Sequence, residues 1–316
     1  MSFETRYVPS ADQLAIASEI EESIADLLPL ARLHASHADG EKIWSGLGDM
    51  GIFGICLPED RGGSALGSVE ETQIVVGLGR RLASPGILAG IAVAHVDPEF
   101  SGRRVAVAYR HGQRSLLVAG EATDLVLLRS RDGATLHESA SCRSRGLDDR
   151  LWLAELREIE QIGDPVARMD GSKLLRLRLI DAAALMGIAA GALDMSVAYA
   201  QMRQQFGRPI GSFQAVKHHC ANMAIAARSA RDQVSFASVA LEDGRDDAAL
   251  QVECALLVAG SAALENAGKN IQVHGGMGFS DEADPHLFLK RAQLMIAIAG
   301  GLEAATAQIA NIKTDW

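Results

Sequence analysis

The sequence has few aromatic residues and a shortage of positive charge, and each shortage excludes something. Phe, Trp and Tyr make up 4% of the 316 residues, although hydrophobic residues as a whole reach 48%. Such a composition favours helices that pack closely through small side chains. Lys and Arg number 30 against 40 Asp and Glu, which gives a formal net charge of −10. A surface of this sign repels phosphate backbones, so we expect no nucleic-acid partner.

Cysteine is also scarce, and its spacing excludes a disulfide or zinc framework. The four cysteines are Cys56, Cys142, Cys220 and Cys254. None forms a C-x-x-C pair, which predicts ordinary reduced thiols. The histidines show no H-E-x-x-H spacing, and we therefore expect no metal.

Long hydrophobic runs are missing as well. The longest uncharged apolar run covers residues 182–193, which is too short to span a bilayer. The opening MSFETRYVPS lacks a basic segment followed by an apolar one, so it is not typical of a secretory signal. We therefore expect a cytoplasmic protein without a membrane partner.

The apolar pattern divides the chain into three regions. Residues 11–95 have helical periodicity, with a broad apolar face formed by Leu14, Ile16, Ile20, Ile24, Leu27 and Leu28. A helix capped by Ser68 is expected there, and Glu70 and Glu71 in its first turn are interpreted as solvated charges. Residues 103–165 change character and hold short β-like runs separated by turn signals.

From residue 173 onward the chain is helical again, with helices predicted near 173–205, 212–241, 246–274 and 285–312. Four long helices joined by short connections predict a bundle. The predicted fold is mainly α with a small β domain, and the predicted domains are 1–98, 99–170 and 171–316. Small residues between 182 and 190 indicate either room for a bulky group or a seam of closely packed helices.

Two helix junctions carry the residues best suited to bind an anion. RQQFGRPIGSFQAVKHH begins at Arg203, and QVHGGMGFSDE begins at Gln272. An arginine offers a forked cation to phosphate, and Gly275 and Gly276 let a ligand approach the backbone without a Cβ in the way. Together they predict a pyrophosphate site between two helix ends. The alternatives are a solvated arginine and a glycine helix cap.

These two segments, together with LGDMGIFGICLPEDRGGSALG near the N-terminus, resemble motifs of the acyl-CoA dehydrogenase family over nearly the whole chain. The resemblance implies an N-terminal helical domain, a reduced middle β-domain and a C-terminal four-helix bundle, with FAD as cofactor. It implies that Arg203 and Phe206 contact the FAD pyrophosphate and adenosine half, and that Gln214 lies along the same groove. Gln272, Gly275 and Gly276 match residues that meet the pyrophosphate of FAD held mainly by a neighbouring subunit. The ending HLFLKRA is similar to forms in actinobacterial enzymes that act on steroid side-chain CoA esters.

The chain departs from the family where a catalytic carboxylate is expected. One family position for this base falls on Leu177, and the other falls on Ala299 or Ala304, depending on the anchor. Leucine and alanine cannot accept a proton. Glu303 is the nearest carboxylate and would serve only if displaced from the family position. The middle region is also short and lacks the flavin-ring signature.

A half-site kept alone makes sense if a second chain supplies the other half. We therefore expect an FAD-binding subunit of an acyl-CoA dehydrogenase, paired with a second acyl-CoA dehydrogenase-like subunit in an α2β2 heterotetramer. The substrate would be an acyl-CoA, with an electron-transfer flavoprotein as acceptor. The alternatives are a self-sufficient dehydrogenase that uses Glu303, a flavin-dependent oxidase or oxygenase, and a relic that binds neither flavin nor CoA.

Overall fold

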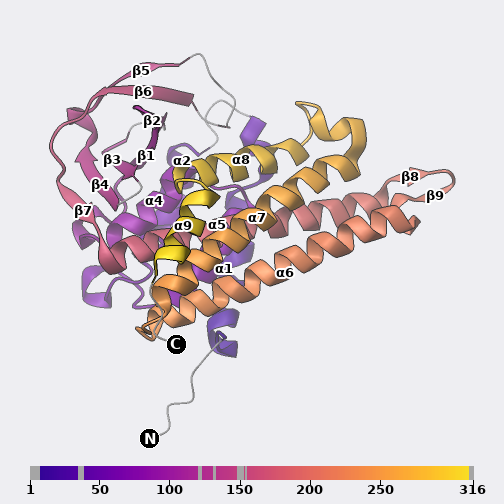
Figure 1. The fold of residues 1–316 in the computed structure, drawn as a ribbon, viewed down its shortest axis with the longest axis horizontal. Helices are drawn as coiled ribbons and strands as arrows, with labels where there is room; N and C mark the ends of the chain where they lie inside the picture. Colours follow the sequence, from indigo (N-terminus) through magenta and orange to yellow (C-terminus); the bar gives the residue numbers. More distant parts are fainter. Residues whose placement is uncertain are drawn as a thin grey trace, which may run out of the picture.

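The computed structural model describes residues 8–34, 39–119, 123–130, 133–147, 153 and 155–312. Short helices occupy the N-terminal part, a seven-stranded sheet follows, and long helices form the rest (Figure 1). This confirms the mainly α fold with a small β portion. The domain limits 1–98, 99–170 and 171–316 stay a prediction.

The N-terminal part is built from short helices around a common core. They are α1 (Ala11–Leu27), η1 (Leu30–His34), α2 (Glu41–Asp49), η2 (Ile52–Gly54), η3 (Glu59–Arg61), α3 (Ser68–Arg80), α4 (Pro85–Ala94) and η4 (Pro98–Phe100). Ser10 and Gln13 form a capping box that starts α1. The apolar face expected on α1 is narrower than predicted, because Ile24 is buried whereas Leu14 and Ile16 are exposed.

The start of α3 corrects two expectations. Its N-cap is Gly67 and not Ser68, and the Gly67 N–H donates to the Glu70 carboxylate at 3.1 Å. Glu242, at the end of α6, accepts from the Val69 N–H at 3.0 Å. Two carboxylates thus accept from two of the free amides at this helix end. Glu70 belongs to the buried polar residues and is not a solvated charge.

The sheet has the strand order β5-β6-β2-β1-β3-β4-β7. Its strands are β1 (Val105–His111), β2 (Arg114–Ala119), β3 (Leu125–Ser130), β4 (Gly133–Glu138), β5 (Arg143–Gly146), β6 (Glu155–Gln161) and β7 (Ala167–Met169). The central pair β1–β3 is parallel, and the other pairs are antiparallel. Alternate residues of β1 point to opposite faces, so Val107 joins the main core while Ala108 joins a smaller cluster behind the sheet.

Long helices form the C-terminal part. They are α5 (Gly171–Met202), α6 (Gln214–Glu242), α7 (Ala248–His274), α8 (Pro285–Ile298) and α9 (Leu302–Asn311), with η6 (Ile210–Ser212) and η7 (Gly275–Phe279) between them. The single helix predicted at 285–312 is wrong. Gly300 and Gly301 adopt φ of 94° and 87°, a conformation that favours glycine, and the chain bends there by 41°.

The small residues of α5 form a packing seam. A Cβ placed on Gly187 would lie 2.2 Å from the Val76 carbonyl oxygen of α3, and one on Gly79 would lie 2.3 Å from the Ala184 oxygen. The two helices therefore cross backbone against backbone. Ala182, Ala183 and Ala184 are buried in the same core, which favours the seam over a space for a bulky ligand.

Two helical stretches, Gly171–Met202 and Ala248–Phe279, are long and apolar enough to cross a membrane by length and composition. A third joins them if α8 and α9 are taken as one broken span. Of the most apolar window, 72% is buried inside the protein in the first stretch and 50% in the second. Packing in the core thus accounts for much of the apolar character of α5.

Candidate functional site

The ends of α5 and α7 meet at one end of the bundle. The rings of Tyr199 and His274 stack with centroids 4.0 Å apart, and the His274 Nδ1 lies 2.8 Å from the Asn270 carbonyl oxygen. Arg203 is the C-cap of α5, one turn after Tyr199, and Gly275 is the C-cap of α7, directly after His274. The structure therefore brings the two predicted junctions to the same end of the molecule, which projects away from the sheet (Figure 1).

A two-residue hairpin extends from this end. Its strands are β8 (Gln204–Gln205) and β9 (Arg208–Pro209), and its turn is Phe206-Gly207. Phe206 and Gly207 adopt φ of 52° and 76°. Two consecutive positive φ values are typical of a type I′ hairpin turn, but a bulky residue in that region is strained by about 1–2 kcal/mol. The hairpin thus keeps an aromatic residue where glycine or asparagine is preferred.

The aromatic side chain at the hairpin tip is not buried by the chain itself. Phe206 is 91% exposed. Its ring meets the Phe213 ring edge-on at 6.1 Å, and the Arg208 guanidinium lies 4.2 Å from the centre of the Phe213 ring. This cation–π contact stiffens the base of the hairpin, while Phe206 stays available to another molecule.

The glycines at the end of α7 leave an open approach to the backbone. Gly275 has φ of 62°, and a Cβ added to Gly275 or Gly276 would find no atom within 4 Å. The Gly275 N–H donates to the Gln272 carbonyl oxygen, so it caps the helix as the alternative interpretation proposed. The cap and the open backbone coexist here, because the cap uses one N–H and leaves the space in front of both glycines free.

The six residues predicted to bind the cofactor all lie exposed at this projecting end: Arg203, Phe206, Gln214, Gln272, Gly275 and Gly276. Gln272 accepts a hydrogen bond from the Lys269 ammonium at 3.1 Å. Within the part of the chain that the structure describes, the Arg203 guanidinium has no ion-pair partner. Their roles toward FAD stay a prediction.

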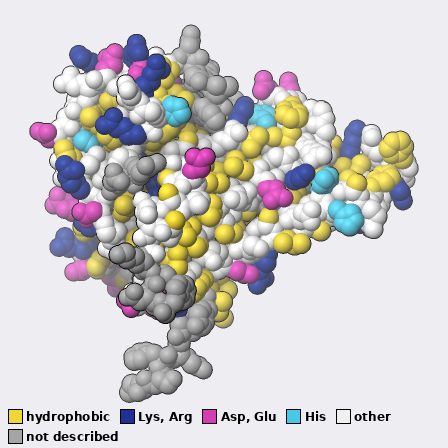
Figure 2. Space-filling model, in the orientation of Figure 1, with side chains coloured by type: hydrophobic (Ala, Val, Ile, Leu, Met, Phe, Trp, Pro, Cys, Tyr) yellow, Lys and Arg dark blue, Asp and Glu magenta, His cyan; other side chains and the backbone are white. Residues whose placement is uncertain are grey.

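Large apolar side chains surround these residues. Met202, Met277 and Phe279 are 73%, 56% and 76% exposed, and they accompany Phe206 on the same end. Figure 2 shows hydrophobic, basic and histidine side chains together on the projecting part. A surface on which several large apolar side chains are exposed together is typical of an interface.

The positions that the resemblance assigns to the catalytic base lie near the opposite end of the bundle. Leu177 is 2% exposed and Ala299 is 6% exposed, so both are in the core. Ala304 is half-buried, and Glu303 is exposed in the first turn of α9. The cavity beside Leu177 is lined from α8 by Met295 and Ile298 and not by Glu303. A role for Glu303 as base stays a prediction.

This cavity is small and is bordered by a buried ion pair. Its volume is about 10 Å³, which is room for about one water molecule. Arg129 of β3 donates to both carboxylate oxygens of Asp181 of α5, at 2.8 and 2.5 Å. A second buried pair, Arg178 with Glu253, lies next along α5, and Arg178 also donates to the Ala299 carbonyl oxygen at 3.4 Å.

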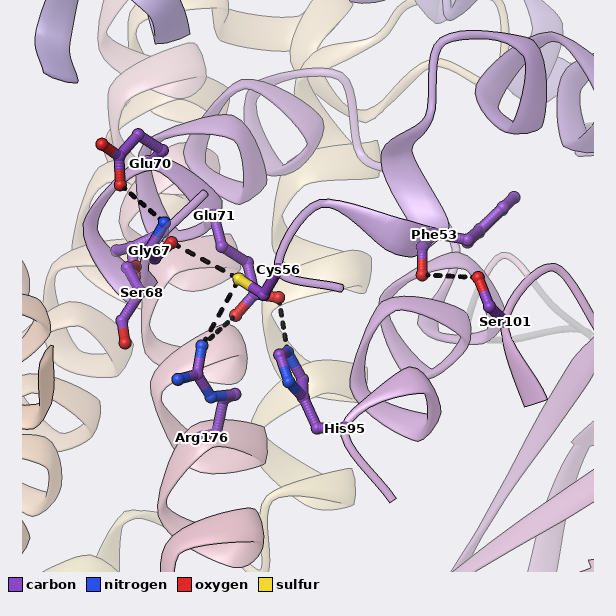
Figure 3. Close-up of polar contacts among 10 residues, drawn as sticks. Phe53, Cys56, Gly67, Ser68, Glu70, Glu71, His95, Ser101 and Arg176 are labelled. Carbon is purple, nitrogen blue, oxygen red and sulfur yellow. Dashed lines mark hydrogen bonds and ion pairs between the residues drawn. The ribbon is translucent and has the colours of Figure 1, made fainter. Parts of the chain in front are cut away.

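A third polar cluster, which the sequence did not predict, joins three segments of the N-terminal part to α5 (Figure 3). The Glu71 carboxylate lies 2.6 Å from the His95 Nε2 and accepts from the Arg176 guanidinium at 3.3 Å. The Cys56 thiol donates to the Gly67 carbonyl oxygen at 3.4 Å. Glu71 is buried, so its interpretation as a solvated charge is wrong.

The charges in this cluster balance each other. Burial opposes ionisation of Glu71, yet the hydrogen bond and charge of His95, with those of Arg176, hold its pKa below the ordinary value. Burial raises the pKa of the Cys56 thiol well above its usual range, so the thiol stays protonated. Donor atoms of Cys56, Glu71 and His95 lie within 4.8 Å of one another, as in a metal site. The Arg176 guanidinium supplies a positive charge to the same carboxylate.

The position of Glu71 was readable in the sequence. Glu71, Val75 and Leu78 recur at the spacing of one helix face, and all three are buried. Its two partners, His95 and Arg176, are distant in sequence, so the ion pairing of Glu71 could not be predicted from a local pattern.

Comparison with known families agrees with the architecture. Residues 168–313 match the family described as acyl-CoA dehydrogenase, C-terminal domain, and residues 10–97 match the family described as acyl-CoA dehydrogenase, N-terminal domain. The match thus covers both helical parts of the chain and leaves strands β1 to β6 outside it.

Among curated proteins, the acyl-CoA dehydrogenase FadE34 of Mycobacterium tuberculosis is 35% identical over 290 residues. The match covers 82% of this chain and only 40% of FadE34. Among solved structures, the ChsE4–ChsE5 complex from Mycobacterium tuberculosis has a TM-score of 0.77 at 22% identity, covering 98% of this chain and 100% of that one. The Tcur3481–Tcur3483 steroid enzyme has a TM-score of 0.75 at 22% identity, covering 95% and 96%. At that identity the two structures show the shared fold.

Proposed function

This chain belongs to the acyl-CoA dehydrogenase family, and from that premise we propose that it is the FAD-phosphate-binding subunit of a heteromeric acyl-CoA dehydrogenase. FAD is the cofactor of the family, and when bound it supplies the hydride acceptor for α,β-dehydrogenation of the thioester. The partner subunit supplies the base that removes the α-proton. This chain supplies phosphate contacts from Arg203 and from the open backbone at Gly275 and Gly276.

One observation carries the proposal. The groups that could bind phosphate and the position expected for the catalytic base lie at different places in the fold, and that position holds no carboxylate. The projecting end holds the Arg203 guanidinium, which has no ion-pair partner among the described residues, together with an amide side chain and two bare glycines. Such a donor set suits a dianionic pyrophosphate. The base position at Leu177 is apolar and buried. A chain with this arrangement can hold a cofactor's phosphates but has no group at that position to accept the α-proton.

The exposed apolar groups support a partner at the projecting end. Phe206, Met202 and Phe279 would be covered by a second polypeptide, which removes their apolar surface from water. The strained Phe206 would then fill a place on that partner or against the cofactor. The ChsE4–ChsE5 complex and the Tcur3481–Tcur3483 enzyme are each named for two different polypeptides, which supports a two-chain enzyme.

The match with FadE34 supports the same view from another side. It leaves more than half of that protein outside the aligned part. A related protein therefore carries, in one polypeptide, additional chain of the size that a complementary subunit needs. For the present chain we place that complement in a second subunit, in an α2β2 arrangement.

Substrate and surroundings follow from the same reasoning. By analogy with the Tcur3481–Tcur3483 steroid enzyme, the proposed substrate is an acyl-CoA whose acyl group is a steroid side chain. The reduced flavin must be reoxidised, and an electron-transfer flavoprotein is the proposed acceptor. The proposed location is the cytoplasm.

The test is to purify the chain alone and together with acyl-CoA dehydrogenase-like partners that carry a base carboxylate. We expect bound flavin, seen by its visible absorbance, and acyl-CoA-dependent reduction of a dye only in the complex. Flavin and ordinary dehydrogenase activity in the lone chain would contradict the proposal and favour a self-sufficient enzyme with Glu303 as base. Oxygen consumption without an added acceptor would instead indicate an oxidase or oxygenase.

A further inference from the structure

The junction between the sheet and the bundle is an interface between two parts of the fold, which is a preferred place for a ligand pocket. Helices α4 and α8 pack against β1, and α5 runs beside them. The cavity there is lined by Leu88 of α4, Leu127 of β3, Leu177 of α5 and Met295 of α8. Pockets that hold small molecules have volumes of roughly 300–1,000 Å³. The cavity of about 10 Å³ is far below that range.

An ion pair between the sheet and the bundle borders the cavity. Arg129 comes from the sheet and Asp181 comes from the bundle, and their side chains are 7% and 2% exposed. The guanidinium and carboxylate meet through two parallel hydrogen bonds, the geometry that fixes both position and orientation. Since ligand and charge pair would have to occupy the same side of the cavity, an acyl chain could enter only if the pair separated.

Separating the pair would be costly. A buried charge that loses its partner is left without compensation, and this strongly favours the closed state. The pair is not needed merely to fill space, because apolar side chains of similar volume fill a core without that desolvation cost. Its value lies in holding the sheet and α5 at one fixed separation.

A second buried ion pair, between Arg178 and Glu253, lies beside the cavity residue Leu177 in the sequence. Arg178 follows Leu177 directly, binds Glu253 of α7, and donates to the Ala299 carbonyl oxygen at the end of α8. Leu177 is thus flanked by two residues of α5 whose charged ends are fixed to three other elements. The bend at Gly300 and Gly301 begins just after the Ala299 carbonyl oxygen that Arg178 holds.

We propose that the Arg129–Asp181 ion pair, backed by Arg178–Glu253, is a plug that excludes acyl chains from the sheet–bundle junction of this chain. The inference rests on the proposed function and deepens it. The heteromer would then have acyl sites only in the partner subunits, and this chain would contribute to the cofactor alone.

The experiment uses the full chain and a photoreactive probe, hexadecanoyl-CoA with a diazirine near the end of its acyl chain. After illumination, peptides that contain Leu88, Leu177 and Met295 are examined by mass spectrometry. We expect background labelling of the wild type. In the double variant Arg129→Ala/Asp181→Ala, which removes both charges and opens space, labelling of these peptides should rise about tenfold, the gain in affinity for burying about two further methylene groups.

Two matched variants separate a plug from mere lack of space. Leu177→Ala enlarges the cavity without touching either ion pair, and its labelling should stay at background. Arg145→Ala/Glu158→Ala removes an ion pair on the sheet surface and should leave labelling unchanged as well.

Labelling of these peptides in the wild type or in Leu177→Ala would overturn the plug. A folded double alanine variant that stays unlabelled, with its fold checked by circular dichroism, would overturn it too. If the double variant does not fold, the wild type and Leu177→Ala still decide between labelling, which contradicts the plug, and background, which supports it. Flavin binding is not read out here, so a failure of the proposed FAD role would be seen separately.

Discussion

The two ends of the bundle use arginine in opposite ways. Near the sheet, Arg129 and Arg178 are buried and each is held by a carboxylate of this chain. At the projecting end, Arg203 is exposed and has no ion-pair partner among the residues that the structure describes. We call the first region, around Arg129 and Arg178, the closed end, because its charges are neutralised within the chain. We call the second region, around Arg203, the open end, because its cation can bind a ligand. An arginine whose counter-charge lies within the chain stabilises the fold. An exposed arginine without a counter-charge among the described residues is a candidate for binding a ligand.

The largest expected effect comes from breaking the closed end. Arg129→Ala leaves the Asp181 carboxylate buried without a partner, and we expect the free energy of unfolding to fall by about 3–5 kcal/mol. Urea denaturation followed by circular dichroism measures this loss.

Two controls define the cause of that loss. Arg129→Leu/Asp181→Leu removes both charges together, and its stability should stay close to that of the wild type or exceed it. Arg145→Ala breaks an ion pair on the sheet surface and should leave the stability close to that of the wild type. An Arg129→Ala variant as stable as Arg145→Ala would show that the closed end does not depend on its internal charge pair.

The second effect concerns the open end and is an effect on binding. Arg203→Ala in the complex should weaken FAD retention by about 1.5–3 kcal/mol, because it removes a charge-assisted contact to phosphate. The unfolding midpoint of the isolated chain should not change, since Arg203 has no partner to lose within the described part of the chain. Flavin released per complex on dilution measures the difference.

Further variants show whether the guanidinium fork matters. Arg203→Lys keeps the charge and loses the fork, so it should restore retention only in part. Arg231→Ala removes an exposed arginine farther along α6 and should have no effect. Gly276→Val should reduce FAD binding by filling the open space before the backbone. Unchanged flavin occupancy in both Arg203→Ala and Gly276→Val would refute the phosphate site.

Sequence reasoning reached the open end better than the closed one. The motifs at Arg203 and Gly275 are local, and helix periodicity alone placed them at helix ends. Consecutive helices of the bundle run antiparallel, so α5 and α7 run parallel and their C-terminal ends lie together. The hairpin turn at Phe206-Gly207 was not predicted, because a positive φ at phenylalanine runs against backbone preference.

The closed end escaped prediction because its contacts join distant residues. Arg129 and Asp181 are separated by 52 positions, and Arg178 and Glu253 by 75. No local pattern links such pairs, and a single charge in a sequence reads as solvated by default. Glu71 was misread for the same reason, since its partners His95 and Arg176 lie 24 and 105 positions away.

A third prediction concerns the Glu71 cluster, which lies on the closed side of the comparison. The pKa of Glu71 is lowered in the folded protein, so its ionised form stabilises the fold at pH values above its ordinary pKa. This contribution is lost as the pH falls through the lower, folded-state pKa. Glu71→Gln should therefore cost about 1–3 kcal/mol at neutral pH, and the gap to the wild type should narrow in acid. Thermal unfolding at pH 7 and at decreasing pH measures it, with the exposed Glu19→Gln as control. A gap that widens in acid would contradict the ion-pair account.

The smallest expected effect is a gain in stability at the open end. Phe206→Gly relieves the positive φ at the hairpin tip, where a side chain is strained by about 1–2 kcal/mol, and glycine gives back roughly half of this through chain entropy. We expect the unfolding free energy of the isolated chain to rise by less than about 1 kcal/mol, while the complex loses flavin or partner affinity. Urea unfolding of the chain and sedimentation of the complex measure the two quantities, with Phe206→Asn as a second residue that tolerates this conformation. If the variant were less stable and the complex unaffected, the phenylalanine would serve the fold of the hairpin, and the open end would owe its shape to this chain alone.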